Sequence, residues 1–219
     1  MSQHPQVVMI IRHGEKPGDL SSDKDGGPDL SVMGSARAAA LASLFTPDPT
    51  AKPIDGMQQV ACDVGSYGSQ FTGTYASTQL SAGQPRFPVP NFIFATAQTN
   101  PPTGSNRPFE TITPLVQALQ ITPNNSYTNT DDSDGIQGLV SAIGTNPMYA
   151  DQVILICWHH GTIPELVEAF GVPKKQLPWD KWPGTVFDLV LSITWDGDTA
   201  NLAPPGYQKL LYNDTAAAG

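Results

Sequence analysis

The stretch Val7-Val8-Met9-Ile10-Ile11-Arg12-His13-Gly14-Glu15 decides how this chain folds, because an apolar run ends abruptly in Arg-His-Gly. Five consecutive apolar residues are typical of a strand buried on both faces, as in a parallel sheet. Open α/β sheets place their ligand sites at the carboxyl ends of such strands. An imidazole there can attack a phosphoryl group while Arg12 neutralises the oxygens, and Gly14 lets the backbone approach an anion. The alternative is a turn whose polar residues only satisfy backbone groups.

A second stretch repeats this arrangement later in the chain. The apolar run at residues 152–158 ends in His159-His160-Gly161-Thr162. Residues 163–171 then predict a short helix, because Pro164 suits its first turn and Gly171 suits the left-handed position after its end. A strand thus delivers a His-Gly pair to the start of a helix, where free N–H groups and the helix dipole favour an anion. Two strand–His–Gly units therefore converge on one predicted anion site.

The paired histidines of the second unit need a choice between them. Neighbours on a strand point to opposite faces, so we expect only one imidazole in the pocket. His160 is the better choice because Gly161 follows it, which leaves His159 as a partly buried packing residue. A metal site is not expected, since adjacent strand positions do not easily ligate one ion and no Cys or acidic residue has suitable spacing.

A third stretch, Ser105-Asn106-Arg107-Pro108-Phe109-Glu110-Thr111, lies between these units and opens a helix predicted over residues 107–119. Arg107 would stand at the helix N-terminus, where its charge opposes the helix dipole. That placement is unfavourable unless an anion lies between the two, which supports a phosphate role. The alternative is an exposed arginine in a solvated loop.

Together these residues resemble the histidine phosphatase superfamily, the phosphoglycerate mutase-like fold. The resemblance rests on Arg12-His13-Gly14-Glu15, on His160-Gly161 and on the Arg-x-x-(Glu/Gln)-Thr pattern that begins at Arg107. The stretch Leu30-Ser31-x-x-Gly34-x-x-Arg37-Ala38 also resembles the first helix of the family. The fold implied is α/β, a three-layer sandwich with a mostly parallel central sheet.

The resemblance also implies the roles of the site residues. His13 would be phosphorylated transiently, while Arg12, Arg107, His160 and Gly161 would form the phosphate pocket, with no metal and no cofactor. Family members usually draw the proton for the leaving group from an acidic residue outside these motifs. Our first candidates are the acidic residues of the loop after the Arg107 helix, which are Asp131, Asp132 and Asp134. A solvated loop is the other interpretation of that run. Glu15 is expected to orient the pocket or to pair with Lys16.

Composition agrees with one phosphatase-sized domain over residues 1–219. The net charge of −9 argues against nucleic acid, polyphosphate or an acidic membrane face as a partner. Cys157 lies in a buried-strand pattern and is expected to be a core residue rather than half of a disulfide with Cys62. The first residues lack the pattern of a signal peptide, and no segment approaches the ~20 apolar residues that span a bilayer. We expect a soluble, cytoplasmic protein of unknown oligomeric state.

The remaining elements are less regular. Ser31 is expected to cap a helix that runs to Phe45. Residues 46–90, rich in Gly, Pro and Thr, predict an insertion that emerges at the pocket edge as an ordered flap. The alternative is an extension that packs on a distant face. Further expected elements are strands at residues 91–97 and 186–195, a short helix at residues 135–144, and a turn at Asp196-Gly197 that pairs the late strand with residues 207–212.

The function that these features predict is phosphomonoester hydrolysis through a phosphohistidine. The substrate would be a phosphorylated small molecule or a phosphoprotein. One alternative is a phosphoglycerate mutase-type phosphotransferase, which needs a pocket that keeps water from the phosphoenzyme. The other is a non-catalytic phosphate-binding scaffold, against which the complete set of two arginines and two histidines argues.

Overall fold

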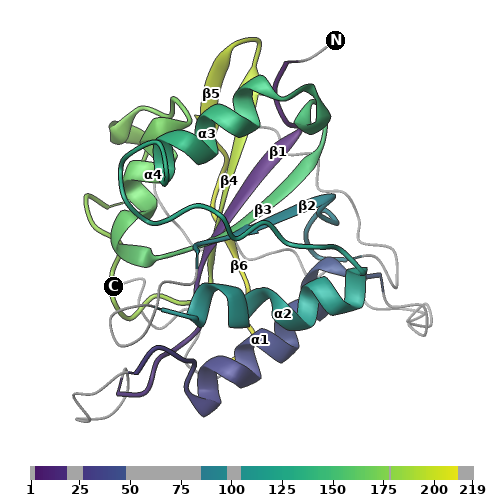
Figure 1. Ribbon diagram of the computed structural model, residues 1–219, viewed down its shortest axis with the longest axis vertical. Coiled ribbons are helices and arrows are strands. Elements are labelled where there is room, and N and C mark those ends of the chain that lie inside the picture. Colours follow the sequence, from purple (N-terminus) through teal and green to yellow (C-terminus); the bar gives the residue numbers. More distant parts are fainter. Residues whose placement is uncertain (1–2, 19–26, 48–84, 98–104, 178, 212–219) are drawn as a thin grey trace, which may run out of the picture.

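A mixed β-sheet forms the centre of the computed structural model, which describes residues 3–18, 27–47, 85–97, 105–177 and 179–211 (Figure 1). The strand order is β2-β3-β1-β4-β5, and the short strand β6 also pairs with β4. The strands are β1 (Val7–Arg12), β2 (Phe92–Ala95), β3 (Val153–Trp158), β4 (Leu189–Asp196), β5 (Thr199–Leu202) and β6 (Gly206–Tyr207).

The two central strands are the two apolar runs that precede the His-Gly pairs. Every residue of β1 and of β3 is buried. The strands pair in parallel, with Val7 opposite Val153 and Arg12 opposite Trp158. Because they run in the same direction and end opposite each other, the residues that follow them emerge at one edge of the sheet. The prediction of two buried strands ending side by side is confirmed.

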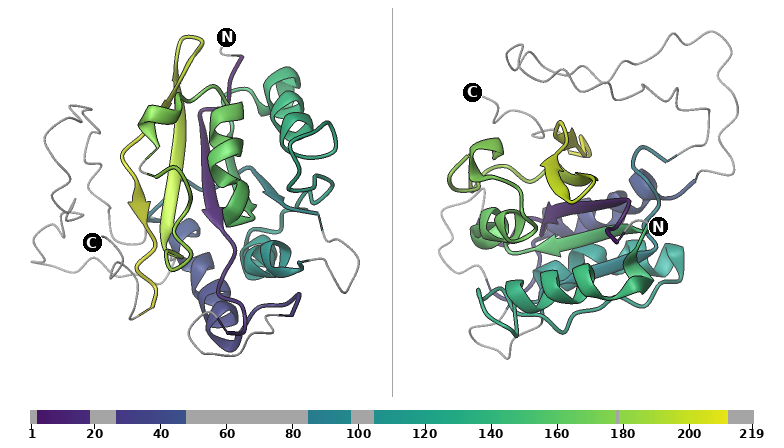
Figure 2. Two further views of the ribbon diagram at one scale, coloured as in Figure 1. Left: turned by 90° about the vertical axis from the view of Figure 1, so that its left-hand side faces the viewer. Right: turned by 90° about the horizontal axis from the view of Figure 1, so that it is seen from above.

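Helices cover both faces of the sheet, as Figure 2 shows from the side and from above. One face packs against α1 (Val32–Phe45) and α2 (Arg107–Leu119), and the other against α3 (Ile136–Thr145) and α4 (Ile163–Ala169). Side chains of β1 alternate between the two cores, since Met9 and Ile11 join the first and Val8 and Ile10 the second. The apolar run is therefore explained by burial on both faces.

Local sequence signals place the helix ends well. The Ser31 hydroxyl accepts a hydrogen bond from the Gly34 N–H at 3.0 Å and caps α1, which ends at Phe45 as expected. Helix α2 begins at Arg107 with Pro108 in its first turn. Gly171 follows α4 with a φ of 91°, the left-handed conformation predicted for it.

Two expectations about the late strands are wrong. The sheet is mixed rather than mostly parallel, because β4 runs antiparallel to β1, and β5 and β6 run antiparallel to β4. The Asp196-Gly197 turn leads into β5, which pairs Asp196 with Thr199, so the hairpin partner is β5. Of the expected partner segment, residues 207–212, Tyr207 pairs with Leu189 of the late strand through β6. Strand β5 lies at the edge of the sheet, and Ala200 is its one buried residue. Its sequence is therefore too polar to be recognised as a strand from an apolar run.

The predicted insertion at residues 46–90 falls largely on residues 48–84, which lie outside the described residues. Its described flanks leave the end of α1 and enter β2, where the Asn91 N–H donates to the carbonyl of Val153 at the start of β3. This is the amino edge of the parallel strands, opposite to the histidines. The expectation that the segment emerges at the pocket edge is therefore wrong for its flanks, because a β–α–β crossover returns the chain to the amino edge.

The apolar runs of β1 and β3 lie in this core. Cys157 is a free thiol buried in β3, as predicted, while Cys62 lies outside the described residues. Within the described ranges, no helix is long and apolar enough to cross a membrane.

Two helical glycines allow a direct test of how tightly α1 is held against the loop after β1. A Cβ on Gly34 would come within 3.0 Å of the backbone N and O of Glu15, whereas a Cβ on Gly144 in α3 would meet nothing within 4 Å. We expect Gly34→Ala to lower the free energy of unfolding by about 3 kcal/mol, in the upper part of the overpacking range. Gly144→Ala should raise it by about 0.5 kcal/mol through helix propensity. Urea denaturation measures both, and equal effects would contradict the predicted close contact.

Candidate active site

Three imidazole rings meet at the carboxyl edge of β1 and β3. The ring centroid of His13 lies 5.7 Å from that of His159 and 5.6 Å from that of His160. The His159 and His160 rings stack with their centroids 5.0 Å apart. One ring nitrogen from each of the three lies within 4.8 Å of the others. We refer to His13, His159 and His160 as the histidine cluster.

The expectation that only one of the adjacent histidines reaches the pocket is wrong. Strand β3 ends at Trp158, so the alternation of side chains no longer applies to the residues after it. His159 is an N-cap with extended backbone, and His160 begins a 3₁₀ turn over residues 160–162. This change of backbone conformation turns both rings toward His13, and a sequence pattern based on strand periodicity cannot reveal it.

His13 is held in one orientation and one tautomer. Its side chain is 1% exposed, and its Nδ1 lies 2.7 Å from the carbonyl oxygen of Gly14. A carbonyl only accepts, so Nδ1 carries the proton and Nε2 carries the lone pair of the neutral ring. In the described part of the chain, this buried Nε2 has no hydrogen-bond partner. The ring therefore holds an oriented nitrogen lone pair that is buried and available to a ligand.

The surroundings of the histidine cluster oppose protonation. Burial, and then the charge of Arg12, lower the pKa of His13 to about 2. Burial and the Arg12 charge also lower the pKa of His160 to about 4, and burial followed by Arg107 lowers that of His159. The His160 ring is therefore neutral at pH 7 in the unliganded protein. A bound phosphate dianion would favour the imidazolium form, because an opposite charge nearby raises the pKa of a histidine.

Arg12 is buried directly behind the cluster. Its Nη1 donates to the carbonyls of Gly184 at 2.8 Å and Val186 at 3.1 Å, and the guanidinium carbon lies 3.6 Å above the ring of Phe187. These contacts fix the guanidinium plane. The charge of Arg12 contributes to the lowered pKa of all three clustered histidines, which places it close to them.

Arg107 is connected to the turn after His13 through one side chain. The Gly14 N–H donates to the hydroxyl of Thr111 at 2.9 Å, and this hydroxyl donates to the Arg107 carbonyl at 2.7 Å. The Arg107 guanidinium donates to the carbonyl of Gly27, and its charge also lowers the pKa of the clustered histidines. The first turn of α2 is thus fixed next to the carboxyl end of β1.

Glu15 supports the turn but pairs with a residue that we did not expect. Its carboxylate accepts from Nε of Arg37 at 3.1 Å and from Nη2 at 2.6 Å, and both side chains are buried. The Lys16 charge contributes to the lowered pKa of His159 and His160, which places this lysine near the histidine cluster.

The N–H of Gly161, which was predicted to line the phosphate pocket, donates to Nδ1 of His159 at 3.3 Å and caps the 3₁₀ turn in the unliganded chain.

The predicted proton donors are exposed, and their hydrogen bonds come from the same loop and from the first turn of α3. The Asp132 carboxylate accepts from the Thr130 hydroxyl and the Asp134 N–H, and the Asp131 carboxylate accepts from the Gln137 amide. Among described residues, none of these aspartates contributes to the pKa shifts of the histidine cluster.

Glu110, which was not predicted as a proton donor, is a further candidate for acid chemistry. Burial raises the pKa of its carboxyl group, while its hydrogen bond from the Leu30 N–H opposes that rise. Its place in the motif after Arg107 was the available signal.

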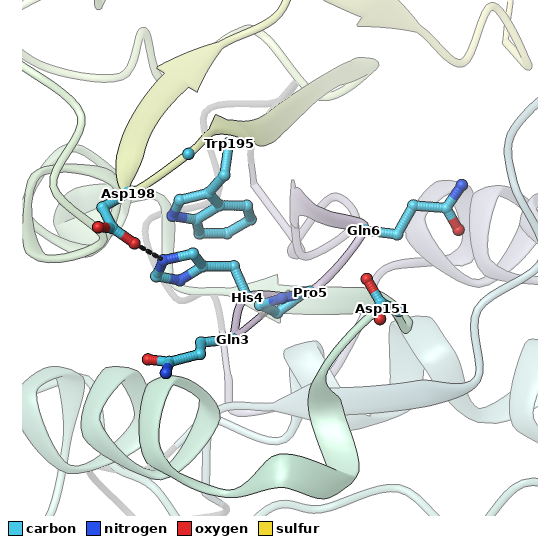
Figure 3. Close-up of a pocket in the computed structure, with 8 residues that line it drawn as sticks. Gln3, His4, Pro5, Gln6, Asp151, Trp195 and Asp198 are labelled. Carbon is cyan, nitrogen blue, oxygen red and sulfur yellow. Dashed lines mark hydrogen bonds and ion pairs between the residues drawn. The ribbon is translucent and has the colours of Figure 1, made fainter. Parts of the chain in front are cut away.

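A cavity of about 610 Å³ lies at the opposite edge of the sheet from the histidine cluster, around the residues that precede β1 (Figure 3). The His4 ring stacks on Trp195 with centroids 5.4 Å apart, and its Nε2 lies 3.4 Å from the Asp198 carboxylate (Figure 3). These contacts join the start of the chain to the β4–β5 turn. We take the histidine cluster rather than this cavity as the candidate active site, because the cluster combines a buried nitrogen lone pair with two nearby arginines.

Comparisons with known proteins agree with this architecture. No protein-family model and no curated protein matches the chain. Among solved structures, an Escherichia coli protein ascribed to alpha-ribazole-5'-P phosphatases superposes with a TM-score of 0.50 at 12% identity, over 94% of this chain and 99% of its own. That likeness shows that the two proteins share a fold.

Two other solved structures are less similar. One is an Agrobacterium tumefaciens protein described as the phosphohistidine phosphatase SixA. It has a TM-score of 0.38 at 12% identity, over 87% of this chain and 92% of its own. A mycobacterial glucosyl-3-phosphoglycerate phosphatase has a TM-score of 0.43 at 13% identity, over 90% of this chain and 96% of its own.

The lowered pKa of His13 makes a prediction about stability. Between pH 2 and 6.5 the unfolded chain binds a proton at this residue and the folded chain does not, so the free energy of unfolding rises with pH. Stability is retained above pH 6.5 and is lost as the pH falls toward 2. We expect the slope between pH 4.5 and 5.5 to be steeper in the wild type than in His13→Asn, by up to about 1.4 kcal/mol per pH unit. Urea denaturation at several pH values measures this slope, and parallel curves would show that His13 titrates normally.

Proposed function

We propose that the protein is a phosphomonoester hydrolase that works through a phosphohistidine on His13. The observation that carries this proposal is the buried imidazole whose Nδ1 is held by the Gly14 carbonyl and whose Nε2 lone pair has no partner among described residues. A nucleophilic histidine needs this arrangement, because the fixed proton on Nδ1 leaves Nε2 free to attack phosphorus. The fold shared with an E. coli phosphatase supports the same conclusion.

The charges around His13 suit a phosphoryl group. Arg12 and Arg107 would stabilise the negative oxygens, and the rings of His159 and His160 would add hydrogen-bond donors once the dianion raises their pKa. Such fixed charge is the main catalytic resource in phosphoryl transfer, because little covalent chemistry is required of the protein. The whole chain carries a net charge of −9, so the positive charge of the two arginines makes this pocket a local exception.

The reaction would proceed in two steps. Nε2 of His13 forms a bond to phosphorus while the bond to the alcohol oxygen breaks, and the departing alkoxide takes a proton from an acid. Asp131, Asp132 and Asp134 remain the proposed donors from the loop, and Glu110 joins them because its raised pKa keeps more of the protonated form. Water then attacks the phosphohistidine, releases phosphate and restores the Nε2 lone pair. The substrate class is a phosphorylated small molecule or a phosphoprotein.

The central test concerns His13. His13→Ala should reduce hydrolysis of a generic aryl phosphate to background, because the nucleophile is lost. The wild type, quenched rapidly during turnover, should carry phosphate that is labile in acid and stable in base. A circular-dichroism melt verifies that the variant is folded. Activity of folded His13→Ala at the wild-type level would exclude the proposed intermediate.

Arg107 offers a graded test of the phosphate pocket. Arg107→Ala should lower kcat/KM by about 1.5–3 kcal/mol, roughly 10- to 150-fold, because a charge-assisted hydrogen bond to the phosphoryl group is lost. The matched control is Lys175→Ala, which removes the same charge from an exposed turn beyond α4. Steady-state kinetics and inhibition by inorganic phosphate report the effect. Equal kinetics for both variants would place Arg107 outside the pocket.

A further inference from the structure

The histidine cluster has a second chemical capacity that phosphate chemistry does not require. We propose that His13, His159 and His160 together bind one divalent transition-metal cation of the Zn²⁺ class. Three imidazoles drawn from two strand ends, each offering a ring nitrogen within 4.8 Å of the others, are the observation behind this proposal. No carboxylate or thiol of the described residues belongs to the group.

The nitrogen atoms are available for coordination. Nε2 of His13 is buried, carries the lone pair of its tautomer and has no partner among the residues that the structure describes. Nδ1 of His160 is likewise buried and unpartnered there. The one competing contact is the hydrogen bond from the Gly161 N–H to His159 Nδ1, which at 3.3 Å is weak and exposed. Little free energy is lost when the His159 ring turns.

The distances require only a local adjustment. Zinc–nitrogen bonds of about 2.0–2.1 Å in a tetrahedral site place the ligand nitrogens ~3.3 Å apart. The nitrogens of the cluster must therefore approach one another by at most about 1.5 Å. His159 and His160 are half-buried and lie in a turn, so rotation of their side chains supplies this movement while His13 stays fixed by Gly14.

The donor set selects the class of cation. Three imidazole nitrogens suit Zn²⁺, Ni²⁺ or Cu²⁺, whereas Mg²⁺ and Ca²⁺ need oxygen ligands that the cluster lacks. Three protein ligands leave one coordination position for water. The charges of Arg12 and Arg107 oppose a bound cation, although backbone carbonyls accept from both and Glu110 partly offsets Arg107. We therefore expect a reversible site rather than a structural one.

Occupancy by a metal would block the proposed catalysis. Nε2 of His13 has one lone pair, which cannot form bonds to a metal and to phosphorus at the same time. Zn²⁺ would thus inhibit hydrolysis, and a phosphoryl ligand would protect the site from the metal. This inhibition rests on the proposed function, whereas binding of the metal does not.

Calorimetric titration with Zn²⁺ alone, in a chelator-free buffer without substrate, tests the binding. The chain has four histidines, and His4 lies at the opposite edge of the sheet, so His4→Ala is a matched control. We expect one ion per chain in the wild type and in His4→Ala. His159→Ala and His160→Ala should each weaken Zn²⁺ binding by at least about tenfold. Loss of a metal ligand lowers the affinity more than loss of a residue that only hydrogen bonds to a ligand, which already costs about tenfold or more. Circular dichroism verifies the fold, and His159→Gln and His160→Gln replace any variant that does not fold.

Every outcome of the titration decides the question. No binding by the wild type, equal affinity in the wild type and both cluster variants, or loss of binding in His4→Ala would each overturn the proposal. Absorption spectra with Co²⁺ give a second readout, since bands of a tetrahedral nitrogen site should appear in the wild type and vanish in His160→Ala. Metal binding without any phosphatase activity would refute the proposed function alone. Activity without metal binding would refute this inference alone.

Discussion

The parallel pairing of β1 with β3 is the constraint on which the rest of the site depends. Because Arg12 lies opposite Trp158, the residues that follow the two strands emerge together, and His13 meets His159 and His160. Both strands are buried on both faces, so a slip of one residue would move every side chain to the other core. The core that fixes the register therefore also fixes the distance between the imidazoles.

The turn after β1 is held from three directions. Thr111 connects the Gly14 N–H to the first turn of α2, and Gly34 lets α1 approach the backbone of Glu15 closely. The Glu15–Arg37 pair then anchors the same turn in the core. Burying this ion pair costs desolvation, and breaking it would leave a buried charge, so it specifies one position of α1 rather than adding much net stability.

Burial and positive charge make the histidine cluster a site for electrophiles and anions. The arginines and the low exposure of His13 lower the pKa values of the rings, so each offers a lone pair rather than a proton in the unliganded protein. A phosphoryl group and a transition metal both accept such a lone pair. The same physical arrangement therefore supports the proposed nucleophile and the proposed metal ligand set.

The sequence by itself determined the elements that depend on local signals. The apolar runs predicted β1 and β3, and Ser31 and Pro108 marked the starts of α1 and α2. The Arg-His-Gly motif singled out His13 as the candidate nucleophile. Tertiary structure decided what local periodicity cannot encode. The polar edge strand β5 exists because β4 offers it a partner, and Glu15 binds Arg37 because α1 folds back onto the turn. His159 reaches the pocket because β3 ends at Trp158, since a ring after a strand end is oriented by the turn that follows and not by strand alternation.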